Sequence, residues 1–148
     1  MSNSINEYGK DSLCKRGWSN LKQGSVLIVD DNSGIRRLLE EVFSTEGYTV
    51  FTAATGLEAI IIAQKHLPNL VLTDIKMPGI NGLDLRDKLL SIDQNIQIIL
   101  MSAYSDLNEI QEKVRFGGIN YLLTKPFDLE QLSMLVDSLL NEKSRKLS

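Results

Sequence analysis

Apolar residues gather along the chain in five short runs, each of strand length. The runs span residues 26–29, 48–53, 70–73, 96–101 and 121–123. Nearly every residue within a run is apolar, rather than every second one, so both faces of each strand are expected to be buried. This pattern is typical of a parallel sheet.

Between these runs lie stretches in which apolar residues recur with the period of an α-helix. The clearest places Ile35, Leu38, Leu39, Val42 and Phe43 at the spacing of one helix face. Further helices are expected at 56–66, 82–91, 106–116 and 128–143, the last opened by Asp128 with Gln131 three residues on, a variant of the capping box. Alternating strands and helices predict an α/β, flavodoxin-like, doubly wound fold, with a five-stranded parallel sheet and helices on both faces.

The pattern divides the chain into a domain at 25–143, an arm at 1–24 and a tail at 144–148. The arm mixes Asn, Ser, Gly and Lys and has no sustained period. It is slightly basic, with Lys10, Lys15, Arg16 and Lys22 against Glu7 and Asp11, whereas the whole chain has a net charge of −3. Docking on the acidic domain and a mobile tail are both open interpretations.

Composition narrows the possible functions. A pI near 5.2 and the acidic balance argue against a nucleic-acid partner. No apolar run approaches the roughly 18–20 residues of a membrane span and no secretory signal opens the chain, so a cytoplasmic protein is expected. One cysteine, Cys14, and one histidine, His66, exclude a multi-thiolate or histidine-cluster metal site.

Polar side chains follow four of the five strands. They are Asp30, Asp31, Asp74, Ser102 and Lys125. Because the carboxyl ends of parallel strands share one edge of a sheet, these side chains are expected to share a crevice. Each alone has an ordinary explanation, such as a helix cap or a surface charge, but their joint placement favours a site.

Three carboxylates in one crevice repel each other unless a cation lies among them, and an oxygen-only site suits Mg²⁺ or Mn²⁺. A carboxylate can also accept a phosphoryl group, and Asp74 is the candidate nucleophile. Lys125 would neutralise the phosphoryl charge, and the Ser102 hydroxyl would hydrogen-bond a phosphoryl oxygen. The chain lacks a phosphate-binding P-loop and a dinucleotide turn, and a dehalogenase-type phosphatase would need an aspartate where Asn32 stands.

Four segments carry a family resemblance: "VLIVDDNSGIRRLL", "LVLTDIKMPGINGLDL", "IILMSAY" and "YLLTKPFD". In this order and spacing they resemble the receiver domain of two-component response regulators. The resemblance implies that Asp74 is the phosphoacceptor and Asp31 a direct metal ligand, with Asp30 acting through water and the backbone carbonyl of Lys76 completing the ligands.

By the same resemblance, Ser102 supplies the switch hydroxyl, and Lys125 is the lysine that receiver domains carry at this position. The peptide bond between Lys125 and Pro126 is expected to be cis. Many receivers carry an aromatic switch residue three positions before that lysine, and this chain has Leu122 there. Neighbouring Tyr121 is expected to point to the opposite side of the strand.

The run "DDNSGIRRLLEEVFSTEGY" resembles the single-domain relay members of the family, of the sporulation type. Such a protein is not an enzyme: it takes a phosphoryl group from a sensor histidine kinase and passes it to a histidine phosphotransferase. The resemblance implies a partner-binding patch of Asn32, Ile35, Arg36, Lys76, Tyr104, Pro126 and Phe127. A monomer without a fused output domain is expected; the alternatives are a chemotaxis-like receiver that binds a target when phosphorylated and a silent interaction module.

Overall fold

A computed structural model describes residues 24–108, 110–111 and 121–147. Its centre is one parallel five-stranded sheet with the strand order β3-β2-β4-β5-β6. The strands are β2 (Ser25–Val29), β3 (Thr49–Ala53), β4 (Leu70–Asp74), β5 (Gln97–Ala103) and β6 (Tyr121–Lys125). The chain goes from β2 to one neighbour, β3, and returns to the other, β4, so the order reverses beside β2. A crevice is expected beyond the carboxyl ends of β2 and β4.

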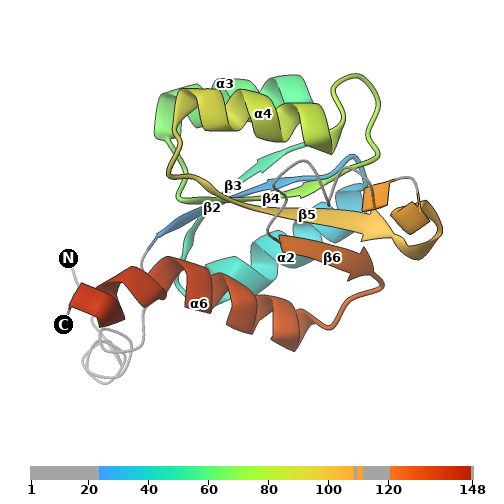
Figure 1. Ribbon diagram of the computed structural model, residues 1–148. Helices are drawn as coiled ribbons and strands as arrows, with labels where there is room; N and C mark the ends of the chain where they lie inside the picture. Colours follow the sequence, from blue (N-terminus) through green and yellow to red (C-terminus); the bar gives the residue numbers. More distant parts are fainter. Residues whose placement is uncertain (1–23, 109, 112–120, 148) are drawn as a thin grey trace.

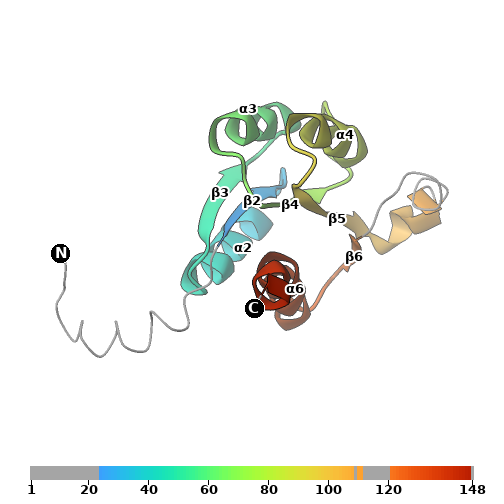
Figure 2. The same ribbon diagram turned by 60° about the vertical axis from the view of Figure 1, so that its left-hand side comes forward.

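Helices cover both faces of the sheet. They are α2 (Ser33–Thr45), α3 (Gly56–His66), α4 (Gly82–Ile92) and α6 (Leu129–Leu147), with a short 3-10 turn, η1 (Tyr104–Asp106). Helices α3 and α4 lie on one face, and α2 and α6 lie on the other (Figures 1 and 2).

Strand β2 shows why the sheet needs both layers. Val26 and Ile28 pack in the cluster beneath α2 and α6, whereas Leu27 and Val29 pack beneath α3 and α4. All four side chains have no exposed surface. Successive side chains of a strand point to opposite faces, so a run that is apolar throughout must be buried on both sides. The predicted doubly wound fold with helices on both faces is confirmed.

The observed bounds differ from the predicted ones at several ends. Strand β4 includes Asp74, β5 runs to Ala103 and β6 runs to Lys125, so three residues expected to follow strands lie within them. The strands extend further because backbone hydrogen bonds join them, and polar side chains do not prevent these bonds. In the register, Asp74 pairs with Met101, and Ala103 pairs with Lys125.

Helix α6 continues to Leu147, so its predicted end at 143 is wrong and part of the expected tail is helical. No glycine or proline occurs in 143–147 to stop it. The predicted helix at 106–116 lies partly outside the described residues. Within the described part of this segment, residues 107–108 and 110–111 are helical. The predicted arm, except Gly24, also lies outside the described residues.

Candidate functional site

Three strands bring the central charged residues together. Asp30 directly follows β2, Asp74 ends β4 and Lys125 ends β6. Because the strands are parallel, all three side chains lie at the carboxyl edge of the sheet, where the crevice was expected. The Asp30, Asp74 and Lys125 residues are separated by up to 95 positions in the chain, yet they form one contact network.

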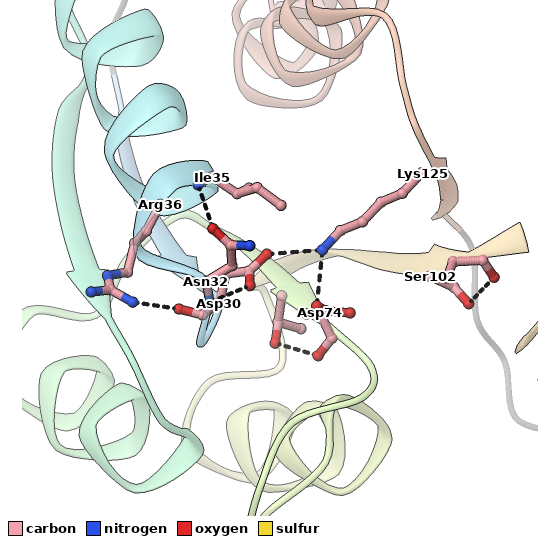
Figure 3. Close-up of polar contacts among 9 residues, drawn as sticks. Asp30, Asn32, Ile35, Arg36, Asp74, Ser102 and Lys125 are labelled. Atoms are coloured by element: carbon pink, nitrogen blue, oxygen red, sulfur yellow. Dashed lines mark hydrogen bonds and ion pairs between the residues drawn. The ribbon is translucent and has the colours of Figure 1, made fainter.

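The Lys125 ammonium lies between the two carboxylates (Figure 3). Its Nζ donates to Asp30 Oδ2 at 3.0 Å and to Asp74 Oδ2 at 2.9 Å. The Asp30 side chain has no exposed surface, and that of Asp74 is 13% exposed. One cation therefore neutralises only part of the negative charge that the sheet edge places in this crevice.

The pKa values of this pair reflect both burial and charge. Burial raises the pKa of Asp74, and the nearby charge of Asp30 adds to this effect, while Lys125 opposes it. Burial alone would lower the pKa of Lys125, but its hydrogen bonds to Asp74 and Asp30 and their charges raise the pKa above its ordinary value. The lysine is therefore held in its charged form, and the ionised form of Asp74 is held at a cost in free energy.

Local backbone contacts fix Asp30. Its Oδ1 accepts a hydrogen bond from the Asn32 backbone N–H at 2.9 Å, and Arg36 Nη1 donates to its backbone carbonyl at 2.7 Å. The cap of α2 is Asn32, whose side chain accepts from the Ile35 N–H at 3.1 Å. The alternative in which the aspartate pair caps this helix is therefore wrong, and both carboxylates remain directed to the crevice edge.

The carboxylates can be gathered around one ion. Oxygen atoms of Asp30, Asp31 and Asp74 lie within 4.8 Å of one another. Asp31 is exposed, so the cluster opens to solvent, and all of its donors are carboxylate oxygens, the ligands that Mg²⁺ and Mn²⁺ prefer. The residues present therefore fit a hard divalent cation. The backbone carbonyl of Lys76 as a further ligand stays a prediction.

Ser102 lies apart from this network. Its side chain is 1% exposed, and its hydroxyl donates to the Ala103 carbonyl at 3.1 Å. Figure 3 shows that hydroxyl turned away from Asp74 and Lys125. The hydrogen bond from Ser102 to a phosphoryl oxygen stays a prediction, and the hydroxyl would have to leave the Ala103 carbonyl to make it.

The residues of the expected partner patch lie in the segments that follow β2, β4, β5 and β6. Ile35 and Phe127 are both partly buried against the core cluster beneath α2 and α6, so Ile35 packs in the core, and its role in a partner patch stays a prediction. Pro126 is exposed and follows a cis peptide bond, as predicted. The Lys76 ammonium lies 3.9 Å from an Asp106 carboxylate oxygen. Tyr104 begins η1, and its side chain lies outside the described part.

Leu122 and Tyr121 face opposite sides of β6. Leu122 packs with the cluster that contains Leu100 and Ile110, whereas Tyr121 packs against the cluster beneath α2 and α6. The prediction that Tyr121 points away from the switch side is confirmed. Tyr121 therefore does not take the place of the absent aromatic side chain.

Two residues that shape the site were not found from the sequence. A Cβ on Gly82 would lie 2.4 Å from the Asp74 carbonyl oxygen, so the start of α4 approaches this backbone closely. Thr73 is fully buried, and its hydroxyl donates to the same carbonyl at 3.0 Å. The sequence signal was weak, because no periodic pattern or motif at Gly82 or Thr73 points to these contacts.

Comparisons with known proteins agree with this geometry. Residues 26–137 match the response regulator receiver domain family. The chain is 45% identical over 119 residues to sporulation initiation phosphotransferase F of Bacillus subtilis (strain 168), covering 80% of this chain and 95% of that protein. A CheY-like receiver domain protein from Methanospirillum hungatei JF-1 superposes with a TM-score of 0.74 at 28% identity, covering 85% of this chain and 98% of the other. Vibrio cholerae chemotaxis protein CheY4 superposes with a TM-score of 0.71 at 28% identity, covering 80% of this chain and 99% of the other.

The chain belongs to the response regulator receiver domain family and is a two-component signalling protein. Receiver domains bind Mg²⁺ at an acidic pocket, and the cluster of Asp30, Asp31 and Asp74 has the composition of such a pocket. They also interact with kinases and phosphotransferases, so this chain is a partner-binding domain.

Proposed function

We propose that the chain is a phosphorelay response regulator that accepts a phosphoryl group on Asp74 and passes it to a histidine phosphotransferase. The observation that carries this proposal is the position of the Lys125 ammonium, hydrogen-bonded to Asp74 and Asp30 beside a third carboxylate at the crevice edge. The 45% identity to sporulation initiation phosphotransferase F supports the relay over other receiver functions.

In the transfer to the chain, an Asp74 oxygen attacks the phosphorus of a partner's phosphohistidine. A P–O bond to Asp74 forms, the P–N bond breaks, and its electron pair stays on the leaving imidazole. Lys125 is already at 2.9 Å from the nucleophile and balances the negative charge that arrives with the phosphoryl group. Transfer onward to a second histidine is the reverse of these bond changes.

Asp30, Asp31 and Asp74 would hold Mg²⁺, or Mn²⁺, with Asp31 as a direct ligand, Asp30 acting through water and the Lys76 carbonyl completing the protein ligands. When bound, the ion would supply positive charge to the phosphoryl oxygens. Ser102 would bind a phosphoryl oxygen once its hydroxyl leaves the Ala103 carbonyl. The chain itself assists its own phosphorylation and dephosphorylation but is otherwise not an enzyme.

The partners would be a sensor histidine kinase and a histidine phosphotransferase. Their docking patch would include the first turn of α2, with Asn32, Ile35 and Arg36, and the segment after β6, with Pro126 and Phe127. Lys76 and Tyr104 would complete the patch. Partly buried Ile35 and Phe127 on one core cluster support an apolar centre, and exposed Pro126 supports access.

We assign residues 25–143 to the receiver, 1–24 to an arm and 144–148 to a C-terminal tail, into which α6 continues. In the described part of the chain, none of the helices combines the length and the apolar composition that a membrane span requires. A cytoplasmic monomer without a nucleic-acid partner fits the net charge of −3 and the family's signalling role.

The experiment that tests the relay follows a labelled phosphoryl group from [γ-³²P]ATP through a purified sporulation-type sensor kinase, this chain and a histidine phosphotransferase. We expect label to reach the phosphotransferase with the wild type and with Asp84→Asn, a control at an exposed aspartate of α4, but not with Asp74→Asn. Label that enters the chain and stays there would favour a chemotaxis-like receiver. Equal relay by Asp74→Asn would refute the assignment of the acceptor.

A further inference from the structure

A groove between α2 and α6 lies outside the phosphoryl site. Its apolar lining includes Val42 of α2 and Leu129 and Met134 of α6, and Met134 is 65% exposed. The groove has a volume of about 460 Å³, which is enough for a large side chain. An exposed methionine on the apolar lining of a groove is typical of a surface that binds another segment.

The charge of this groove is negative. Glu46, Glu130 and Asp137 line it, and the described lining residues include no lysine or arginine. The pKa of the adjacent Tyr48 is raised to about 12, mainly by burial, and the negative charges of Asp137 and Glu46 add to the rise. A segment that binds here should therefore combine apolar side chains with positive charge.

Such a segment occurs in the same chain. Residues 15–22, with the sequence KRGWSNLK, carry Lys15, Arg16 and Lys22 around the apolar Trp18 and Leu21, and contain no acidic residue. The pattern of basic and apolar side chains in this segment complements the groove in both charge and hydrophobicity.

The chain also enters the described domain beside this groove. A Cβ on Gly24 would lie 3.2 Å from Leu140 Cδ1, so the start of β2 lies against α6. Leu140 follows Asp137 by three residues, about 4.5 Å along the helix, and Glu130 is about 10 Å further on. The eight residues 15–22 can extend over about 26 Å, so they reach the whole groove.

We propose that residues 15–22 dock in the groove between α2 and α6 of the same molecule, with Trp18 or Leu21 against Met134 and the basic side chains near Glu46, Glu130 and Asp137. The docked segment covers the side of the domain formed by these two helices. This proposal does not depend on the phosphoryl chemistry of Asp74.

The chain supplies its own probes, since Trp18 is the single tryptophan and Cys14 the single cysteine. Acrylamide quenching of Trp18 fluorescence should be weak in the full-length wild type and should rise severalfold in Met134→Glu. The matched control is Ile61→Glu on α3, because Ile61 is 64% exposed and Met134 is 65% exposed. We expect wild-type quenching in that control. Equal and complete quenching in all three proteins would overturn the proposal.

A nitroxide spin label on Cys14 locates the arm without any substitution in the groove. In the ¹⁵N-labelled wild type we expect broadening of the amides around Val42, Glu130 and Met134, and no broadening around Ile61. Broadening confined to α3 and α4 would overturn the proposal. So would broadening in a mixture of spin-labelled unenriched chain with ¹⁵N-enriched unlabelled chain, because a second copy would then occupy the groove.

Discussion

Replacement of Lys125 by methionine removes the ammonium that donates to both Asp30 and Asp74, while it keeps most of the aliphatic stem. Two unit charges at about 4 Å interact by about 4 kcal/mol at an effective dielectric constant near 20. Loss of one partner of a buried ion pair typically costs about 3–5 kcal/mol, because the other charge stays buried. Lys125 is 20% exposed, so solvent weakens the interaction and we expect a loss of about 3 kcal/mol.

Urea unfolding at pH 7 in the presence of a chelator measures this loss, with Lys88→Met as the matched control. Lys88 is exposed on α4, so its replacement should change the free energy of unfolding by at most about 0.5 kcal/mol. The pKa of Lys125 is raised in the folded state, so its contribution is complete below the ordinary value of 10.5 and is lost as the pH rises through the higher folded pKa. A loss in Lys125→Met no larger than in Lys88→Met would refute this reasoning.

Three further predictions concern the surroundings of the site and the core. The pKa of Asp74 is raised, so the stability that its protonated form contributes is complete below the ordinary value of 3.8 and is lost as the pH rises through the folded pKa. At pH 7 without metal the ionised carboxylate therefore destabilises the fold, and Asp74→Asn should raise Tm by a few degrees in calorimetry. Gly82→Ala should lower the free energy of unfolding by about 2 kcal/mol in urea, since its Cβ would overlap the Asp74 backbone. Tyr48 has a pKa of about 12 against an ordinary 10.0, so stability should fall between these pH values in the wild type, and Tyr48→Phe should remove that part of the fall. Each prediction has an outcome that contradicts it. These outcomes are a lower Tm in Asp74→Asn, an unaltered free energy of unfolding in Gly82→Ala, and an unchanged fall of stability at alkaline pH in Tyr48→Phe.

The sheet and the charged crevice were predictable because they depend on periodicity and topology. Continuous apolar runs such as 26–29 predict strands buried on two faces, and the alternation with helices predicts a parallel sheet. Once the strands are parallel, their carboxyl ends must share an edge. The meeting of Asp30, Asp74 and Lys125 follows from that geometry alone.

The details that depend on single contacts were not predictable. Asn32, rather than an aspartate, caps α2, because the choice among neighbouring polar residues depends on the local backbone path. The close approach of Gly82 to Asp74 joins the start of α4 to the end of β4, and no periodic signal marks it. The orientation of the Ser102 hydroxyl is a side-chain rotation, which the sequence pattern does not specify.

The central claim, that Asp74 is the phosphoacceptor, is tested most directly by intact-mass spectrometry after incubation with acetyl phosphate and Mg²⁺. We predict that the wild type gains the mass of one phosphoryl group, that Asp74→Asn gains none, and that prior chelation of the metal prevents the gain. No gain in the folded wild type, or the same gain in Asp74→Asn, would contradict the claim.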